Sequence, residues 1–414
     1  MAAERLSSVL THLKPGQNPV DRITQKNPDD VVITLALRTP LCKAGKGGLK
    51  DTPLDGILFK LLQQVLQKSR LDPQLVEDIC VGNVNDSKAA YYTRAAMLAA
   101  GFPNTTAGST VNRFCSSGLK ATQDIANQIE HGDIEVGLAI GAESMSSGGD
   151  RLERVFVDDI MNSGVSDAVD CLQPMGQTSE NVAKDFNVTR ELQDRYAAES
   201  YRRAETAQKA GWFADEIAPI TVTRDGKSVT LTQDEGIRPG TTFEVLSKLR
   251  PAFPSFGDRS TGGNSSQVTD GAAAVLMMKR SKALELGQPI LAKYVGTTVA
   301  GLAPRIMGIG PSIAIPKLLG KYGLDLDKDI DVVELNEAFA SMAVYCRDTL
   351  KLDWQKMNPR GGAIALGHPL GCTGARQIVT GLSECRRRKA KVLLTSMCIG
   401  TGMGMAGLFV NEML

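Results

Sequence analysis

The chain has 414 residues, of which 42% are hydrophobic and 22% are charged, and its formal net charge at pH 7 is +1. This length exceeds what one ordinary hydrophobic core spans, so two or three domains are expected. The balance of both charge signs and an aromatic content of 5% exclude a dedicated nucleic-acid surface and an acidic tail.

The eight cysteines are dispersed and include no C-x-x-C pair, a pattern that favours a reducing compartment over a disulfide framework. No apolar run is long enough to cross a bilayer. Only three histidines are present, His12, His131 and His368, so few positions can supply an imidazole to a reaction.

Residues 1–29 are predicted to form a targeting segment rather than part of the folded core. Arg5-Leu6, followed after five residues by His12-Leu13, resembles the N-terminal peroxisomal import signal. A mitochondrial presequence would be richer in arginine. We therefore expect a peroxisomal protein whose import receptor reads Arg5, Leu6, His12 and Leu13.

Residues 30–146 alternate predicted strands and helices, which indicates a parallel α/β unit. The predicted strands are 31–37, 79–82 and 136–141, and the predicted helices are 54–67, 93–100 and 119–129. Cys115 lies before the last of these helices, in the stretch 112–118. Because uncapped N–H groups carry partial positive charge at a helix N-terminus, we expect Cys115 to have a lowered pKa and a nucleophilic thiolate. Glu143, after the third strand, is interpreted as a hydrogen-bond anchor rather than a general base.

Residues 147–264 differ in character from what precedes them. Predicted strands become few, and the one long predicted helix, 189–210, is highly charged. We interpret this part as an insertion into the first α/β unit, which resumes at 265–288. Long insertions in α/β enzymes commonly cover a binding site.

Residues 289–414 repeat the pattern of the first unit. The predicted strands are 290–295, 330–335 and 391–396, and the predicted helices are 313–319 and 373–386. His368 precedes Gly371 by three positions, as Cys115 precedes Gly118. This spacing predicts that the two residues lie in equivalent strand-to-helix turns of a duplicated fold. The helix N-terminus is expected to keep the imidazole of His368 neutral.

Two further polar positions follow predicted strands, Asn336 and Cys398, and a glycine-rich loop begins at Gly400. Ligands bind at the carboxyl ends of parallel strands. Two thiols, an imidazole and an amide at such a place can transfer an acyl group: one thiol is the nucleophile, the imidazole activates it, and the second thiol moves a proton.

Other kinds of site use the same residue types. Cys115, His368, Cys372 and Cys398 could bind zinc, but the spacing of His368 and Cys372 lacks a second knuckle. The glycine-rich loop lies too close to the C-terminus to open a dinucleotide-binding βαβ unit.

Four stretches together resemble the signature blocks of the thiolases. They are 112–119, 336–339, 367–369 and 398–402, and they occur in the family's order within a similarity that runs from residue 31 to residue 410. The resemblance implies an α/β fold of two duplicated thiolase halves, with layered helices and mixed sheets, and an inserted loop domain that binds coenzyme A. It also implies thiolytic cleavage of 3-ketoacyl-CoA to acetyl-CoA and a shortened acyl-CoA, the last step of fatty-acid β-oxidation.

The family's mechanism implies a role for five positions. Cys115 would attack the substrate and become acylated, after His368 takes its proton. His368 and a water held by Asn336 would form an oxyanion hole for the departing enolate, and the N–H groups of Cys115 and Gly400 would form a second. Cys398 would protonate the enolate and later activate coenzyme A.

The resemblance further implies contacts with the substrates. Arg238 is expected at the nucleotide part of coenzyme A, Ser266 at the pantetheine, and four apolar residues along the pantetheine and acyl tunnel: Met175, Phe253, Met307 and Phe339. Coenzyme A is a substrate in this family, so neither a resident cofactor nor a metal is expected. A homodimer is the expected assembly.

Three alternatives remain at this point. A biosynthetic acetoacetyl-CoA thiolase would run the same chemistry towards condensation, although Pro174, where such relatives often have a histidine, favours a degradative enzyme. A non-catalytic lipid-carrier relative would keep the fold without the reaction. A decarboxylating ketoacyl synthase is expected to carry a histidine near Asn336, and none of the three histidines lies there.

Overall fold

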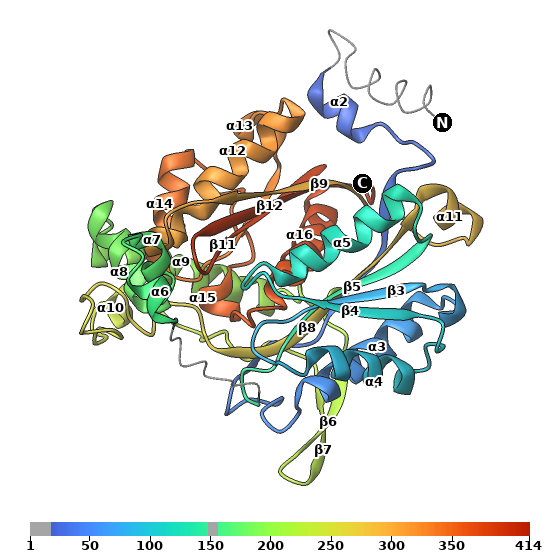
Figure 1. The fold of residues 1–414 in the computed structure, drawn as a ribbon, viewed down its shortest axis with the longest axis horizontal. Coiled ribbons are helices and arrows are strands. Elements are labelled where there is room, and N and C mark those ends of the chain that lie inside the picture. Colours follow the sequence, from blue (N-terminus) through green and yellow to red (C-terminus); the bar gives the residue numbers. More distant parts are fainter. Residues whose placement is uncertain (1–17, 148–155) are drawn as a thin grey trace.

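The computed structural model describes residues 18–147 and 156–414 (Figure 1). The expected import signal at Arg5, Leu6, His12 and Leu13 lies outside the described residues. Within the described ranges, no helix combines the length and the apolar character that a membrane crossing requires.

The first α/β half is built around a mixed sheet. Its strands are β1 (Val31–Arg38), β2 (Cys42–Lys43), β3 (Asp78–Gly82), β4 (Ala107–Val111), β5 (Val136–Glu143) and β8 (Thr269–Lys279), and its helices are α3 (Leu54–Ser69), α4 (Ala89–Ala100), α5 (Ser117–His131) and α11 (Arg280–Glu285), with a 3-10 turn at Pro73–Leu75. β3 is parallel to β4 and β5, and β8 lies antiparallel between β5 and β1. Every residue of β5 is buried, as expected for a strand covered on both faces.

The second half repeats this arrangement. Its strands are β9 (Ala292–Gly301), β10 (Val332–Leu335), β11 (Val392–Ile399) and β12 (Met403–Asn411), and its helices are α12 (Gly310–Tyr322), α13 (Leu326–Asp329), α14 (Ala340–Leu350), α15 (Ala363–Leu366) and α16 (Thr373–Arg388), with a 3-10 segment at Pro304–Ile309. β10 is parallel to β11, and β12 lies antiparallel between β11 and β9. Met357 bridges Val333 in parallel, where β4 pairs with β3 in the first half. The predicted duplication is therefore confirmed.

The two halves join through an antiparallel contact between β1 and β9, at Val32–Lys293 and Ile33–Ala292. The ten strands form one sheet in the order β10-β11-β12-β9-β1-β8-β5-β3-β4, with β2 beside β8. The sheet folds back on itself at this join, so that its two parts face each other with α5 and α16 between them (Figure 1). Because α3 and α4 cover one outer face and α12 covers the other, helices and sheets alternate in five layers.

The central helices α5 and α16 touch through glycines in their first turns. A β-carbon at Gly118 would lie 2.7 Å from the backbone nitrogen of Ala375, and one at Gly374 would lie 2.3 Å from that of Leu119. Only glycine allows so close an approach. The reciprocal contact makes Gly374 the counterpart of Gly118.

Cys115 and His368 therefore lie in equivalent turns before the central helices, as predicted, but not at equivalent positions within those turns. α5 begins at Ser117, two residues after Cys115, whereas α16 begins at Thr373, five residues after His368. The register taken from Gly371 is wrong by three residues because the loop that carries His368 is longer.

Within residues 156–264, the described part of the expected insertion, six further helices and strands accompany the predicted long helix, which forms as α9 (Arg190–Lys209) with the side chain of Thr189 as its N-cap. The others are α6 (Asp158–Met161), α7 (Ser166–Asp170), α8 (Met175–Asp185), β6 (Ile220–Arg224), β7 (Lys227–Leu231) and α10 (Phe243–Leu246). The β6–β7 hairpin projects from the body of the molecule (Figure 1). A further short helix, α2 (Pro19–Thr24), precedes the first half.

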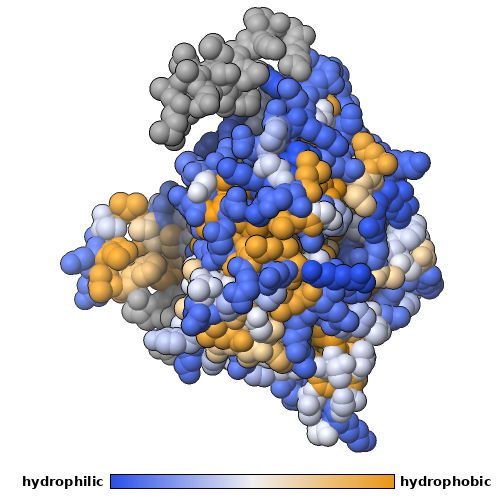
Figure 2. Space-filling view, turned by 90° about the vertical axis from the view of Figure 1, so that its right-hand side faces the viewer, coloured by the Kyte–Doolittle hydropathy of each residue, from blue (hydrophilic) through white to orange (hydrophobic). Residues whose placement is uncertain are grey.

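The face seen in the side view is mostly hydrophilic, with smaller hydrophobic groups at its left and lower margins (Figure 2). Figure 2 shows the side on which α11 lies, where hydrophobic residues gather in the middle of the face and hydrophilic residues surround them. The interior contains two large apolar clusters, one on each side of the first half's sheet, and a third, small cluster beside Cys398.

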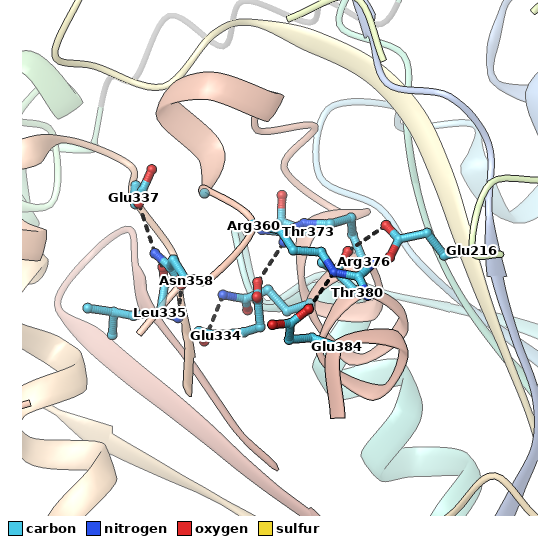
Figure 3. A network of polar contacts seen from close by, with 12 residues as sticks. Glu216, Glu334, Leu335, Glu337, Asn358, Arg360, Thr373, Arg376, Thr380 and Glu384 are labelled. Atoms are coloured by element: carbon cyan, nitrogen blue, oxygen red, sulfur yellow. Dashed lines mark hydrogen bonds and ion pairs between the residues drawn. The ribbon is translucent and has the colours of Figure 1, made fainter. Parts of the chain in front are cut away.

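Buried ion pairs fasten the insertion to both halves. Arg38 of β1 lies 2.7 Å from Glu216 and 2.7 Å from Asp234, both in the insertion. Glu216 also lies 3.1 Å from Arg360, which pairs with Glu384 of α16 at 2.8 Å (Figure 3). One continuous chain of charges therefore connects the insertion, β1 and α16.

Candidate active site

Cys115 lies in a tight turn between β4 and α5. Phe114 adopts a φ of 47°, and its N–H donates to Oδ1 of Asn112 at 2.9 Å. The hydroxyl of Ser117 donates to the carbonyl of Phe114 at 2.7 Å and accepts from the N–H of Arg113 at 2.9 Å. These bonds hold the thiol directly in front of the first helical residue.

The protonation state of Cys115 differs from the prediction. Burial raises the pKa of its thiol to about 11, although the N–H groups of Gly400 and of Cys115 itself lower it, and Glu143 raises it further. The expected lowered pKa is wrong, because loss of hydration outweighs two backbone hydrogen bonds. A base is needed to take this proton.

His368 is buried in the loop between α15 and α16, and its ring is held at both nitrogens. Nδ1 lies 2.6 Å from Oγ1 of Thr373, whose hydroxyl donates to the carbonyl of Pro369 at 3.1 Å. The proton of the imidazole therefore belongs on Nδ1, which leaves Nε2 with a free lone pair. Nε2 lies 3.3 Å from Nδ2 of Asn336, which donates to it.

The pKa of His368 is lowered to about 3, first by burial and then by the charge of Arg376. The predicted neutral imidazole is confirmed, but its cause differs. Because α16 begins only at Thr373, burial and a nearby guanidinium act in place of the helix N-terminus.

Asn336 directly follows β10, and its backbone N–H donates to the carbonyl of Ser396 on β11 at 2.9 Å. Its side chain is buried, and within the described residues Oδ1 has no hydrogen-bond partner. Such an acceptor next to the imidazole suits a water or a substrate group.

Cys398 is buried near the end of β11, with Sγ 3.9 Å from Sδ of Met342. Burial raises the pKa of its thiol well above the usual value, and Cys115 and Cys346 raise it further. Cys398 is therefore held as a thiol, the form that donates a proton.

The packing of the elements brings these groups to one buried region. A β-carbon at Gly118 would lie 2.8 Å from the carbonyl of Gly371, so the first turn of α5 rests on the loop that contains His368. The backbone N–H of Gly400 also hydrogen-bonds to the thiol of Cys115. The residues gathered there are Cys115, Asn336, His368, Cys398 and Gly400.

The four apolar residues expected along the substrate tunnel also come together. Met175, Phe253, Met307 and Phe339 pack in one small cluster with Ala338, Met342 and Cys398. The rings of Phe253 and Phe339 meet edge to face with centroids 6.0 Å apart. Glycines make room for two of these side chains, since β-carbons at Gly176 and Gly308 would lie 2.5 Å from Phe253 and 2.2 Å from Met342.

Ser266 lies next to this cluster, and Arg238 is linked through Gln267 to the loop of His368. The N–H of Ser266 donates to the carbonyl of Ala338 at 3.0 Å. Nη2 of Arg238 donates to Oε1 of Gln267 at 3.3 Å, and the carbonyl of Gln267 accepts from the N–H of His368 at 3.0 Å. Gln267 is thus a support that sequence reasoning missed.

Glu143 is the hydrogen-bond anchor that was predicted. Its carboxylate accepts from the side chain of Asn83 at 3.0 Å and from the N–H groups of Val84, Asn85 and Gly371 at 3.1, 3.2 and 3.0 Å. The last of these lies in the loop of His368, so Glu143 ties the first half to the second. Burial raises its pKa to about 7.

Met342 and Arg376 are further residues near the site that sequence reasoning missed. Met342 lies on α14, directly after the stretch 336–339, and only the apolar character of that helix pointed to it. Across residues 18–147 and 156–414, no group of three or more His, Cys, Asp or Glu side chains is placed to hold a metal ion.

Comparison with known proteins gives one consistent result. The thiolase N-terminal domain matches residues 31–281, and the thiolase C-terminal domain matches residues 288–411. The chain is 50% identical over 419 residues to the peroxisomal 3-ketoacyl-CoA thiolase of Yarrowia lipolytica, covering 99% of this chain and 100% of the relative. It is 48% identical over 422 residues to the human peroxisomal 3-ketoacyl-CoA thiolase, with 98% and 99% covered.

Solved structures agree. The dimeric peroxisomal thiolase of Saccharomyces cerevisiae matches with a TM-score of 0.90 at 45% identity, over 95% of this chain and 100% of that one. A second structure of the yeast enzyme matches with a TM-score of 0.79 at 42% identity, over 94% and 100%, and is described as five-layered and built from two core domains of identical topology. The layers and the duplication found here follow the same plan.

Proposed function

This chain belongs to the thiolase family, and from that premise we propose that it cleaves 3-ketoacyl-CoA with coenzyme A in peroxisomal fatty-acid β-oxidation. The products are acetyl-CoA and an acyl-CoA shortened by two carbons. The observation that carries the proposal is the similarity over nearly the whole chain to peroxisomal 3-ketoacyl-CoA thiolases. The degradative reaction is thereby favoured over the biosynthetic, carrier and synthase alternatives.

In the first half-reaction, Cys115 is the nucleophile and His368 is the base. Nε2 of His368 takes the thiol proton as sulfur attacks the 3-keto carbon, so that neither charge is left alone in the buried site. The N–H groups of Cys115 and Gly400, which already approach the sulfur, stabilise the tetrahedral oxyanion. The bond between C2 and C3 then breaks and leaves an acyl-cysteine.

The leaving group is the enolate of acetyl-CoA, whose oxygen carries the negative charge. The imidazole of His368 and a water on Oδ1 of Asn336 hold this oxygen, a role that the free acceptor of Asn336 supports. Cys398, kept protonated by burial, donates its proton to C2 and releases acetyl-CoA.

In the second half-reaction, coenzyme A replaces acetyl-CoA. The thiolate of Cys398 removes the thiol proton of coenzyme A, and the new thiolate attacks the acyl group on Cys115. The shortened acyl-CoA leaves, and the proton on His368 returns to Cys115. Because the acyl group waits on the enzyme between two substrates, the kinetics are ping-pong.

The substrate contacts are proposed from their positions around this centre. Met175, Phe253, Met307 and Phe339 line the route of the pantetheine and the acyl chain to Cys398, which their shared apolar cluster supports. Ser266 contacts the pantetheine, and Arg238 contacts the nucleotide part of coenzyme A. All the chemical steps use side chains and backbone N–H groups, so coenzyme A serves as substrate and no resident cofactor is needed.

The organisation proposed for the chain has four parts. They are a targeting segment at 1–29, a first half at 30–146 with 265–288, a coenzyme A-binding insertion at 147–264, and a second half at 289–414. The protein is peroxisomal and homodimeric, like the relatives it resembles. An import receptor that reads Arg5, Leu6, His12 and Leu13 accounts for its delivery.

The decisive experiment is a cleavage assay with the purified protein. With coenzyme A present, both acetoacetyl-CoA and a long-chain 3-ketoacyl-CoA should disappear and acetyl-CoA should form, whereas the Cys115→Ala variant should form none. Cleavage of acetoacetyl-CoA alone would support the biosynthetic alternative. Equal turnover by Cys115→Ala would overturn the mechanism.

A further inference from the structure

Arg376 and Glu334 form a fully buried ion pair beside the catalytic loops. Nη1 of Arg376 lies 2.8 Å from Oε2 of Glu334, and neither side chain is more than 1% exposed. Figure 3 shows the two facing each other between β10 and α16, with Thr373 earlier on the same helix. The free energy lost when both charges leave water can exceed the free energy gained from their attraction. A pair of this kind therefore calls for a functional explanation.

One face of α16 supports both His368 and Asn336. Thr373 holds Nδ1 of His368, while one turn later Arg376 holds the side chain of Glu334. Gln377, next to it, donates to the backbone carbonyl of Glu334 at 3.0 Å. Positions three and four apart share a helix face. Since Glu334 stands two residues before Asn336, this face sets the contact of Asn336 with His368.

The duplicated fold offers an internal comparison on the strand side. In the second half Glu334 pairs with Thr395 across β10 and β11, and in the first half Cys80 pairs with Ala139 across β3 and β5. Both Cys80 and Ala139 belong to an apolar cluster that faces the central helices. The first half thus fills the corresponding place without a carboxylate.

The same comparison holds on the helix side. The contact that makes Gly374 the counterpart of Gly118 makes Arg376 the counterpart of Lys120. Lys120 is partly exposed and pairs with Asp124 on its own helix. Among the described residues, α5 therefore packs on its sheet without a buried ion pair to a strand, whereas α16, beside His368 and Asn336, forms one with β10.

The ion pair with Glu334 satisfies only part of the hydrogen-bonding capacity of Arg376. In the described part of the chain, Nε and Nη2 of Arg376 and Oε1 of Glu334 have no hydrogen-bond partner. The positive charge of the guanidinium also lowers the pKa of His368. A positive charge that disfavours the protonated imidazole of His368 also attracts an anion bound beside it.

We propose that Arg376, held in place by Glu334, is a positioning residue for thiolysis that fixes His368 against Asn336 and favours the negative charge of the enolate oxygen between them. This inference rests on the proposed function. Arg376 touches neither substrate nor the reacting atoms, so its contribution belongs to turnover rather than to substrate binding.

The test separates a chemical role from a structural one. Arg376→Met should lower kcat roughly 10- to 100-fold, by analogy with the range found for residues that orient metal-binding histidines from behind, and leave KM for coenzyme A within about twofold. The double variant Glu334→Leu with Arg376→Met replaces the pair by apolar side chains, which is often neutral or stabilising. We expect it to restore the thermal midpoint while kcat stays low.

Matched variants complete the design. Lys120→Met removes the counterpart in the first half and should keep kcat within about twofold, and Arg376→Lys, which retains the charge, should recover part of the kcat lost in Arg376→Met. Recovery of kcat together with stability in the double variant would overturn the proposal, as would wild-type kcat in Arg376→Met. If neither methionine variant folds, wild-type kcat in Arg376→Lys overturns the positioning role. An inactive wild-type protein would instead contradict the proposed function.

Discussion

The thiol of Cys115 starts the reaction from its less reactive form. Burial keeps it protonated, and the same burial keeps His368 neutral, with Nε2 free to accept a proton. Substrate binding must therefore precede proton transfer, because only the developing oxyanion gives the transferred charge a partner. An acyl transferase benefits from this order, since a permanent thiolate would react with other electrophiles.

Alkylation by iodoacetamide measures this state directly. With the pKa of Cys115 raised to about 11, its thiolate fraction in the free protein grows as pH rises towards that value, so the rate at Cys115 should still be increasing at pH 9. Mass mapping distinguishes Cys115 from the half-exposed Cys171. Prior acylation by substrate should block the reaction at Cys115. A rate that levels off near pH 7 would show that the thiolate is present at rest.

The candidate residues of the site could be picked out one by one from the sequence, but the pKa of Cys115 could not be predicted. Cys115, His368, Asn336 and Cys398 stood out by type and by position after strands; the structure buries all four and places Nε2 of His368 3.3 Å from Nδ2 of Asn336. The burial that reverses the expected pKa of Cys115 depends on packing from both halves, which no local pattern encodes. The charge of Glu334 within the apolar strand β10 was the one sequence signal for the pair with Arg376.

At the level of helices and strands, prediction succeeded where periodicity was strong. α3, α5, α9 and α16 form close to their predicted limits. β4 was missed because Ala-Gly-Ser-Thr-Val has little strand character, and β12 because its glycine-rich start suggested a loop. β12 is a strand because β9 and β11 pair with it on both sides, a tertiary effect. The register error between the two turns has another origin, the longer loop that carries His368.

The buried charges around the insertion predict a sharp difference in stability between two arginines. Arg38→Met leaves Asp234 buried without an arginine partner and removes one of the two arginines that pair with Glu216, so it should lower the free energy of unfolding by about 3–5 kcal/mol. Arg195, whose ion pair with Glu191 is 57% and 62% exposed, is the control, and Arg195→Ala should cost less than about 1 kcal/mol. Urea unfolding of both variants tests this. Similar costs would mean that the buried chain of charges contributes little.

On the scale of the whole molecule, the ten-stranded sheet ends differently on its two sides. Beyond β10 the segment at Met357 bridges Val333 and covers that edge. At the other end β4 pairs only with β3 among the strands of the described residues, and most of its residues are exposed. An uncovered edge strand invites pairing with another chain. In the second half, the position of β4 is taken by the segment at Met357, which forms a single bridge. In the first half, β4 is a full strand, and its outer edge has no partner strand among the described residues.

We expect the homodimer to form through this edge, with β4 of each protomer antiparallel to its copy about a twofold axis. Ser109→Glu with Thr110→Glu then places like charges opposite each other and should convert the dimer to a monomer, as measured by light scattering after gel filtration. Thr221→Glu with Thr223→Glu on the exposed face of β6 is the matched control and should remain a dimer. Far-ultraviolet circular dichroism checks that both variants fold. Because the turn with Cys115 follows β4 directly, loss of the dimer should also lower kcat. A Ser109, Thr110 variant that stays dimeric would show that the protomers meet through another face.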